Sequence, residues 1–444
     1  MPDQITHLTT HDAPCSRRGF LAAAGAGAAT LASAAWLDAS AQQATPAASG
    51  PGTPNASAPK PPDISFPPTT ARSEQQEGPL RNPDPPPSRV GYAVVGLGRI
   101  ALGEVLPALG ESKHSRLVAL VTGDMAKGRT VAQQWGVPER SVYGYADIER
   151  LASDPGVQVV YIALPNSMHA EFTVRAAKAG KHVLCEKPMA TSVAEAEQMI
   201  AACKAAQRQL MIAYRIQYEP HNREVQRMLR AKELGAPRII ELINTQTQGD
   251  PEHWRMKRAI AGGGSLPDVG IYCFNTARFL TGEEPAEIRA MIQTPNGDPR
   301  FREVEATVLW QMRFPSGVVA NCTTSYDSHR SRRYRVHFED GWAELDPAFA
   351  YRGLEMHIGR AKGTTIIREE RKLPEQPSQF AREIDHFSER VRANQRAYTP
   401  GEEGLQDHRV MAAIYQAAST GRAVTLPPSN GLDVTRGAPP AESG

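Results

Sequence analysis

A glutamate and a lysine stand side by side at the end of an apolar segment, in HVLCEKPMA at residues 182–190. Pro188 follows directly and restricts the backbone, which favours a fixed turn and allows a cis peptide. An ammonium group in such a turn can hydrogen-bond a reacting oxygen and stabilise negative charge beside it. The plainer alternative is that the strand has surfaced and that Glu186 and Lys187 are both solvated. Which interpretation holds depends on the residues that accompany Lys187.

Asp268 and Tyr272 form a second candidate pair, in GGGSLPDVGIY at 262–272. They are four residues apart, so on a helix they share one face. Oxidation of an alcohol requires hydride loss from the carbon and proton loss from its hydroxyl. A free tyrosine, with a pKa of about 10, is a poor base at neutral pH unless a cation lowers that value. Lys187 would supply the cation, and Asp268 would orient Lys187 or a substrate hydroxyl.

Gly96, Gly98 and Ala101 form a G-x-G-x-x-A turn that follows the apolar segment YAVV and precedes a helical segment. Glycines at these positions allow a tight turn and let the backbone approach a pyrophosphate at a helix N-terminus. The motif alone is weak, but its strand–turn–helix context at the start of a series of βα units makes it specific. It predicts a dinucleotide site, with a tight turn that binds no ligand as the alternative.

The residues at the end of the second apolar strand, VTGDMAKGR, bear on the choice of cofactor. NAD sites carry an acidic residue there, which binds the ribose 2′-hydroxyl. Thr122 occupies that position here, followed by Gly123, with Lys127 nearby and Arg99 in the glycine turn. A small hydroxyl residue with cations suits a 2′-phosphate, so the pattern favours NADP. An inward-pointing Asp124 would favour NAD instead.

Apolar strands alternate with helical segments over residues 89–214, which indicates a parallel sheet covered on both faces. After Tyr214 the predicted strands are joined by short turns, which indicates an antiparallel sheet in a second domain. The predicted parallel strands are YAVV at 92–95, 116–122, 157–165, 182–187 and 209–214, with helices such as 168–179 and 192–206 between them. Helical patterns at 378–393 and 404–420 close the chain. The fold class is therefore α/β, with an N-terminal Rossmann domain and a C-terminal α+β domain.

Length and composition bound the function. A chain of 444 residues is too long for one ordinary core, so two domains are expected. Fifty basic and 48 acidic residues give a net charge of +2, which offers no reason to expect nucleic acid as a partner. Five cysteines without a C-x-x-C pair predict neither a disulfide framework nor a metal site. A small molecule is the expected partner.

The N-terminus carries SRRGFLAAAGAGAATLASAAW, an arginine pair followed by a weakly apolar segment. This is typical of a twin-arginine export signal, here residues 1–41 with cleavage after Ala41. An uncleaved membrane anchor is the alternative, although the apolar segment is short and interrupted by glycine. The route carries folded proteins, which suits a protein that loads a cofactor before export. We expect a periplasmic or extracellular protein without stable membrane association after cleavage.

The chain divides by composition into further segments. Residues 42–88 hold 13 of the 36 prolines and form an arm or linker. The dinucleotide-binding domain is expected at 89–214 and the α+β domain at 215–430. Residues 431–444 are expected to form a C-terminal tail.

Together the motifs resemble the Gfo/Idh/MocA oxidoreductases, in particular the glucose–fructose oxidoreductase branch, over about residues 89–430. The matching motifs are GLGRIA, PNSMH at 165–169, CEKP, YR at 214–215, GGGSLPDVGIY, and GEEGLQDHRVMAAIYQAASTGR at 401–422. The tyrosine of DVGIY supports the branch, because many other branches resemble D-x-G-x-H there. The resemblance implies that the second domain has an open, mainly antiparallel sheet that supports a homo-oligomer, either a dimer or a tetramer.

The resemblance also implies roles for individual residues. Lys187 and Pro188 would lie beside the nicotinamide, joined by a cis peptide, with Lys187, Asp268 and Tyr272 catalytic. NADP would stay bound between oxidation of one sugar and reduction of another. The residues expected at the sugar are His169, Lys187, Asp268, Tyr272 and Tyr351. The residues expected at the cofactor, from the glycine turn and the resemblance together, are Gly96, Gly98, Arg99, Ile100, Thr122, Gly123, Lys127, Pro165, Asn166, His169, Glu186, Lys187, Arg215, Trp254 and Arg255.

Three functions are consistent with these residues. The first is an exported NADP-dependent oxidoreductase that transfers hydride to or from an aldose or a similar polyol or ketose. The second is a glycosidase that uses the nicotinamide transiently, an exception to hydrolysis by paired carboxylates. The third is a non-catalytic sugar-binding protein, since fold alone does not establish catalysis. The combination of Lys187, Asp268 and Tyr272 argues against the third.

Overall fold

The computed structural model describes residues 88–440. The predicted export signal, 1–41, and the proline-rich arm apart from Ser88 lie outside the described residues. Within residues 88–440, no helix combines the length and apolar character needed to cross a membrane. The four cysteines in this range are all buried and free, as expected for small apolar residues.

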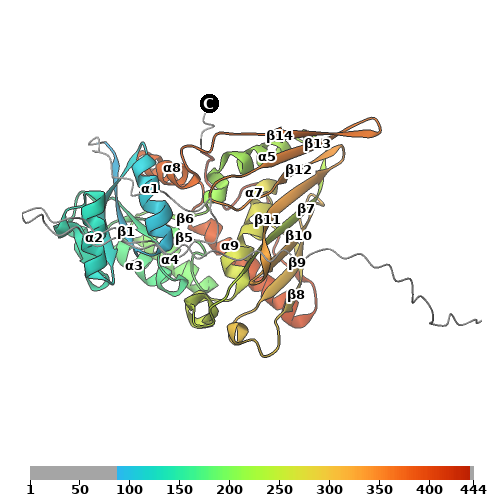
Figure 1. Cartoon of the computed structure of the whole chain (residues 1–444). Coiled ribbons are helices and arrows are strands. Elements are labelled where there is room, and N and C mark those ends of the chain that lie inside the picture. The colour runs from blue at the N-terminus through green and yellow to red at the C-terminus, as the bar shows by residue number, and fades with distance from the viewer. Residues whose placement is uncertain (1–87, 441–444) are drawn as a thin grey trace, which may run out of the picture. The chain divides into compact units, whose positions relative to one another are not determined.

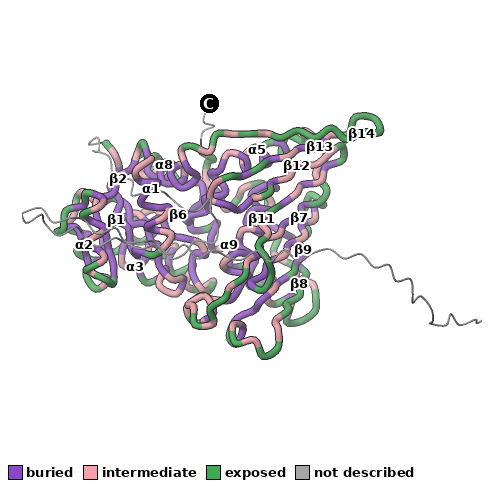
Figure 2. Tube along the Cα trace, viewed as in Figure 1, coloured by how far each residue is buried: buried purple, intermediate pink, exposed green. Residues whose placement is uncertain are grey.

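A parallel sheet forms the first half of the described chain (Figure 1). It has six strands in the order β3-β2-β1-β4-β5-β6. Its strands are β1 (Val90–Val95), β2 (Ser115–Thr122), β3 (Val142–Gly144), β4 (Val159–Ile162), β5 (His182–Glu186) and β6 (Leu210–Ala213). The predicted Rossmann-type sheet is confirmed, and β3 is an additional short edge strand. Every residue of β1 is buried, because helices cover both faces of the sheet (Figure 2).

Four α-helices lie between these strands. They are α1 (Leu106–Glu111), α2 (Met125–Trp135), α3 (His169–Lys178) and α4 (Val193–Ala205). Helices α3 and α4 begin within one residue of the starts predicted at 168 and 192. Asp124 and Ser192 accept main-chain hydrogen bonds from Lys127 and Glu195, which caps α2 and α4 respectively. The carboxyl ends of the parallel strands therefore lead directly into helix starts, where ligands bind in such folds.

A nine-stranded, mainly antiparallel sheet forms the second half, in the order β14-β13-β12-β11-β7-β10-β9-β8-β15. Its strands are β7 (Pro237–Thr247), β8 (Glu287–Gln293), β9 (Thr307–Arg313), β10 (Val319–Ser325), β11 (Asp327–Phe338), β12 (Gly341–Leu345), β13 (Met356–Lys362), β14 (Thr365–Arg371) and β15 (Val424–Thr425). Of its pairings, β7 with β10 is parallel. Buried and exposed residues alternate along β9, so one face of the sheet is covered and the other open.

Helices α5 (Pro220–Arg230), α7 (Ile271–Thr281) and α9 (Gly401–Thr420) lie on the covered face (Figure 1). A helical turn, Leu266–Gly270, leads directly into α7. This continuous segment packs against β7 and β10. It carries Asp268 and Tyr272 from the second domain toward the end of β5, where Lys187 lies.

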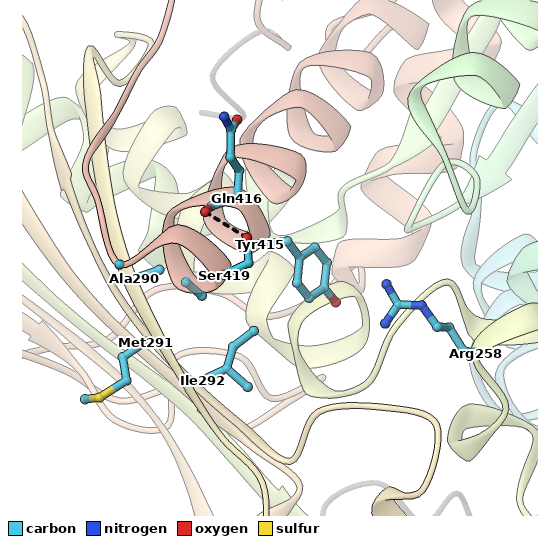
Figure 3. A pocket seen from close by; sticks show the side chains of 9 residues that line it. Arg258, Ala290, Met291, Ile292, Tyr415, Gln416 and Ser419 are labelled. Atoms are coloured by element: carbon cyan, nitrogen blue, oxygen red, sulfur yellow. Dashed lines mark hydrogen bonds between the residues drawn. The ribbon is translucent and has the colours of Figure 1, made fainter.

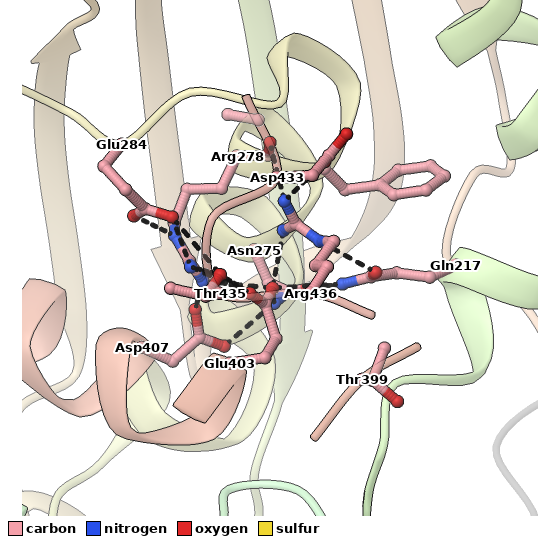
Figure 4. Close-up of polar contacts among 12 residues, drawn as sticks. Gln217, Asn275, Arg278, Glu284, Thr399, Glu403, Asp407, Asp433, Thr435 and Arg436 are labelled. Atoms are coloured by element: carbon pink, nitrogen blue, oxygen red, sulfur yellow. Dashed lines mark hydrogen bonds and ion pairs between the residues drawn. The ribbon is translucent and has the colours of Figure 1, made fainter. Parts of the chain in front are cut away.

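Two C-terminal segments differ from expectation. Helix α8 (Gln379–Ala393) packs against α1 and β2, so the chain returns to the first sheet after building the second. Tyr92 of β1 donates a hydrogen bond to the main-chain oxygen of Ile384 at 3.1 Å. The expected tail is packed over its described part, because the Arg436 side chain is fully buried in a network of ion pairs (Figure 4). A break at residue 214 therefore does not separate all contacts of the two sheets.

Candidate active site

The glycine turn after β1 has the geometry that a pyrophosphate site requires. Gly96 has a φ of +91°, and a Cβ there would lie 2.4 Å from the main-chain oxygen of Ala163. Gly98 is exposed, and a Cβ there would meet nothing within 4 Å. The main chain at Gly98 is therefore open to a ligand just where the helix containing Arg99 and Ile100 begins. The residues present fit a bound dinucleotide.

The end of β2 is arranged around Asp124 and Lys127. The Asp124 carboxylate accepts a hydrogen bond from the Lys127 main-chain N–H at 3.0 Å, so it caps α2. Thr122 is buried, and its Oγ1 accepts a hydrogen bond from the Asp124 N–H at 3.2 Å. The Lys127 ammonium donates to the main-chain oxygen of Leu97 at 2.5 Å, which places its charge at the glycine turn. A cation rather than a carboxylate from α2 thus contacts the glycine turn. Gly123 is exposed and directly precedes Asp124, the N-cap residue of α2.

Lys187 and Pro188 are joined by a cis peptide, as the resemblance implied. His169, at the start of α3, is fully buried beneath this turn. Its Nδ1 lies 2.9 Å from the Pro188 main-chain oxygen and its Nε2 lies 2.8 Å from that of Leu164. Burial lowers the pKa of the His169 ring despite these acceptors. The geometry favours a supporting role under the turn over the contact with sugar or cofactor that the resemblance implied.

A second histidine, which the sequence did not single out, supports the same turn from α9. The main-chain N–H of Ala190 donates to Nε2 of buried His408 at 3.0 Å. His408 lies within the GEEGLQDHR motif, so the motif was quoted but this role was not assigned. The segment that carries Lys187 is therefore held from two helices that are far apart in sequence.

The structure brings together the three residues predicted to be catalytic. The Lys187 Nζ donates to the Asp268 main-chain oxygen at 2.8 Å and lies 3.5 Å from its Oδ1. The same Nζ lies 4.7 Å from the centroid of the Tyr272 ring. The Lys187 and Asp268 side chains are 13% and 14% exposed, so they remain accessible within a largely dry site. An ammonium so close to a ring face is favourable in such surroundings.

The other oxygen of Asp268 has two partners of its own. The Arg255 Nε donates to Oδ2 at 2.9 Å, and the Tyr326 hydroxyl donates to the same atom at 2.6 Å. Burial alone would raise the pKa of Asp268, but Arg255, Lys187 and the Tyr326 hydroxyl more than offset it and hold that pKa well below its usual range. Asp268 is therefore ionised at neutral pH.

Arg255 contacts the Asp268 carboxylate, and Trp254 lies against Arg255. The Arg255 guanidinium carbon is 4.4 Å from the centroid of the Trp254 ring. Their expected contact with the cofactor stays a prediction, because the contacts of both residues in the structure are with other protein groups. The short helix Arg258–Ala261 follows Arg255 in the chain. Asn166, the residue after Pro165, donates a hydrogen bond from its side-chain amide to the Ala261 main-chain oxygen at 2.8 Å. This bond joins the two halves of the site.

Arg215 is buried behind Tyr272. Its guanidinium carbon lies 5.0 Å from the Tyr272 ring centroid and 4.5 Å from that of Tyr351. Its Nη2 donates to the Phe349 oxygen at 2.8 Å, and its Nη1 donates to Gln379 and to the Ala350 oxygen. Arg215 thus holds Tyr272 and Tyr351 in place rather than projecting into open space. Burial raises the pKa of Tyr351, so its hydroxyl stays protonated.

Glu186 points into the protein. Its Oε1 accepts a hydrogen bond from the Tyr161 hydroxyl at 2.8 Å, and only 7% of the residue is exposed. Burial raises the pKa of Glu186, although Lys187 opposes this effect. The side chains of the adjacent residues Glu186 and Lys187 therefore point in different directions, with Glu186 in the core and Lys187 at the candidate site. Its expected contact with the cofactor remains a prediction.

A larger concavity lies elsewhere, between α9 and β8 (Figure 3). It has a volume of about 660 Å³ and is lined by Arg258, Tyr415, Met291, Ile292 and neighbouring residues. Figure 3 shows Tyr415 on the helix facing Arg258, with Met291 and Ile292 on the strand side. No carboxylate lines it, whereas the space beside Lys187 and Tyr272 is much smaller. We assign the active site by its acid–base groups rather than by size.

Known proteins share this architecture. A family model described as "Oxidoreductase family, NAD-binding Rossmann fold" matches residues 90–214, and "GFO/IDH/MocA C-terminal domain" matches 222–344. D-xylose 1-dehydrogenase [NADP(+)] of Haloarcula marismortui is 29% identical over 345 residues, which cover 76% of this chain and 93% of that protein. D-xylose 1-dehydrogenase (NADP(+)) 2 of Haloferax volcanii is 30% identical, covering 76% and 99%.

Solved structures agree. The aldose-aldose oxidoreductase from Caulobacter crescentus, crystallised with glycerol, is 46% identical, with a TM-score of 0.74 over 76% of this chain and all of that one. A levoglucosan dehydrogenase in complex with NADH and levoglucosan is 20% identical with a TM-score of 0.67, which shows the shared fold alone. The two matched domains and the glycine turn identify the chain as a member of the Gfo/Idh/MocA family of NAD(P)-dependent oxidoreductases.

Proposed function

We propose that the protein is an exported, NADP-dependent sugar oxidoreductase that transfers hydride between an aldose and its nicotinamide cofactor. One observation carries this proposal: the Lys187 ammonium lies between Asp268 and Tyr272 at the carboxyl end of β5. The relatives named above as D-xylose dehydrogenases and as an aldose-aldose oxidoreductase support an aldose as substrate.

The residues divide the chemistry between them. Lys187 hydrogen-bonds the hydroxyl oxygen of the carbon that is oxidised, and Tyr272 takes the proton from that hydroxyl. Asp268, held by its own partners, keeps Lys187 in position. The nicotinamide, when bound, accepts the hydride that leaves the same carbon, so oxidation of an aldose at its anomeric carbon yields the lactone. With a second aldose the proton returns from Tyr272 and a sugar alcohol forms, as microscopic reversibility requires.

The cofactor preference rests on the end of β2. One oxygen of the Asp124 carboxylate caps α2, and the Lys127 ammonium donates to the Leu97 oxygen of the glycine turn. An ammonium has three donors, so Lys127 can bind a 2′-phosphate while it keeps its bond to Leu97. This arrangement favours NADP over NAD, in line with the NADP(+) in the names of both xylose dehydrogenases.

The open face of the second sheet is consistent with a homo-oligomer. Ile239 of β7, Met291 of β8 and Leu309 of β9 are 42%, 61% and 38% exposed on it. Large apolar side chains gathered on one open sheet face commonly mark an interface. Native mass spectrometry of the purified protein tests this together with the cofactor: a dimer or tetramer with bound NADP is expected, and a monomer would contradict the assembly.

The activity is tested with the purified full chain, its bound nucleotide and D-xylose or D-glucose. The proposal expects reduction of the nicotinamide with formation of lactone, and reoxidation when a second aldose is added. Release of free sugar from an aryl glycoside, without net change of the cofactor, would instead identify a glycosidase. Sugar binding with neither reaction would identify a binding protein.

A further inference from the structure

We propose that Tyr326 is a positioning residue that, with Arg255, draws the Asp268 carboxylate away from Lys187, so that the ammonium keeps a free donor for the reacting oxygen. This inference rests on the proposed function, because it explains how Lys187 stays available to a sugar hydroxyl.

The two oxygens of Asp268 are used differently. Oδ2 accepts from the Tyr326 hydroxyl at 2.6 Å and from the Arg255 Nε at 2.9 Å. Oδ1 faces Lys187 at 3.5 Å, which is long for a charge-assisted bond. The short bond of Lys187 goes instead to the Asp268 main-chain oxygen, at 2.8 Å. The carboxylate is thus oriented by the pair on Oδ2, and the lysine by a neutral carbonyl.

The charges around Asp268 explain why the position of its carboxylate matters. Two cations, Lys187 and Arg255, share the single negative charge of Asp268. A carboxylate in close contact with Lys187 would occupy a second donor of the ammonium and offset more of its charge at the site, whereas one held by Arg255 and Tyr326 leaves that donor free. Because an ammonium has three donors and one is taken by the carbonyl, donors remain for a substrate oxygen. The remaining charge acts at Tyr272, whose ring lies 4.7 Å from the Lys187 Nζ.

Tyr326 is built to hold a fixed position. It directly follows β10, is fully buried, and packs in a small apolar cluster with Met256, Val269 and Phe301. Its N–H donates to the Ala306 oxygen, and its own oxygen accepts from the Gln248 N–H, so both sides of its backbone are tied. Burial raises the pKa of Tyr326 well above its usual value, so its hydroxyl stays protonated and donates. The Tyr326 ring is therefore held in place and does not shift if the Asp268 carboxylate moves toward Lys187.

Tyr326→Phe tests the inference by removing one hydroxyl from a packed ring. Without it, the carboxylate should turn toward Lys187. The kcat for aldose oxidation should fall by roughly 10- to 100-fold, the range for one lost hydrogen bond to a charged group. The rising limb of the kcat–pH profile should move to higher pH, because a carboxylate close to Lys187 weakens the field of that ammonium at the Tyr272 ring. The dissociation constant of NADPH should not change. Tyr92→Phe, the same change at a fully buried tyrosine of the first sheet, is the matched control and should leave the profile in place.

A crystal structure of Tyr326→Phe provides a readout that needs no activity. The Lys187 Nζ to Asp268 Oδ1 distance should shorten from 3.5 Å to that of a close ion pair. An unchanged distance would overturn the inference, and so would an unchanged pH profile. If the variant does not fold, Arg255→Gln removes the guanidinium that binds Oδ2. The distance from Lys187 Nζ to Asp268 Oδ1 should shorten in that variant too, and an unchanged distance would overturn the inference. Absence of sugar oxidation in the unmodified protein would defeat the proposed function alone, because the distance is measured independently.

Discussion

At the scale of single residues, the meeting of Lys187, Asp268 and Tyr272 was predictable because all three follow local rules. Lys187 ends a strand of a parallel sheet, and Asp268 and Tyr272 are spaced to share a helical face. Tyr326 was not predictable, because it reaches Asp268 from the turn after β10 and no sequence spacing links the two residues. The burial of His169 and Glu186 was equally hidden, because sequence does not show which side of a turn or strand end a polar residue faces.

The cofactor preference is tested at Lys127. Lys127→Ala should weaken NADP binding by about 10-fold or more while changing NAD binding little, because NADP alone presents a 2′-phosphate to a charged donor. Titration of nicotinamide fluorescence with each reduced cofactor measures both dissociation constants. Arg129→Ala is the matched control, since Arg129 lies on the same helix but pairs with Glu139 at the surface. Equal losses for both cofactors would show that Lys127 does not bind the 2′-phosphate.

At the scale of elements, the two sheets were predictable from apolar segments and turns, whereas the packing partner of α8 was not. A helical pattern shows which residues are apolar but not which sheet they cover. The return of α8 to the first sheet places Gln379 against Arg215 and buries Glu383 one turn later. Neither carboxyl oxygen of Glu383 has a hydrogen-bond partner among the described residues. β3 was missed because three residues are too few to show a pattern.

Glu383 makes α8 a source of pH-dependent stability. Burial, and then Glu186, raise the pKa of Glu383 well above its usual value despite Arg215, so the folded protein holds it protonated. The unfolded chain releases that proton above about pH 4.5, so this stability is complete at lower pH and is lost as pH rises toward the raised pKa. Glu383→Gln should remove that loss, by up to about 1.4 kcal/mol per pH unit.

Urea unfolding at about pH 5 and about pH 8 measures the difference. The variant should gain free energy of unfolding relative to the natural protein as pH rises. Glu389→Gln, on the same helix but exposed, is the control and should show no such gain. Parallel pH dependences for Glu383→Gln and the natural protein would mean that Glu383 is ionised when folded.

At the scale of the whole molecule, a buried ion cluster ties the C-terminal segment to α7 and α9 (Figure 4). Arg278 pairs with Glu284, Glu403 and Asp407, and Arg436 pairs with Glu403. Burial raises the pKa of Asp407 to about 7, partly offset by Arg278, which limits the surplus of negative charge. The composition of residues 431–444 suggested a tail because a single arginine carries no sign that its partners are buried.

Removal of Arg436 tests how firmly this segment is held. Arg436→Ala should lower the free energy of unfolding by about 3–5 kcal/mol, because it leaves Glu403 with an uncompensated buried charge. Chemical denaturation measures the change. Arg422→Ala, at an exposed position after α9, should alter stability little. Equal, small effects of the two substitutions would show that the segment contributes nothing to the folded state.

Export is tested at the arginine pair, which lies outside the described residues. Lys in place of both Arg17 and Arg18 should leave folded precursor in the cytoplasm, because the twin-arginine transporter reads that pair. Cell fractionation followed by immunoblotting locates the protein. Continued export of the double variant would exclude this route.

The central claim is that Tyr272 takes the proton while hydride leaves the sugar, with Lys187 making this possible. Single-turnover reduction of the bound cofactor by an aldose, followed at the nicotinamide absorbance, tests it most directly. Tyr272→Phe keeps the ring against Arg215 and Phe349 but loses the hydroxyl, so the rate should fall roughly 10²–10⁴-fold with cofactor still bound. Lys187→Ala should fall at least as far, and the double variant little further, because the two act as a unit. Tyr92→Phe should react normally. A near-normal rate in Tyr272→Phe would contradict the account.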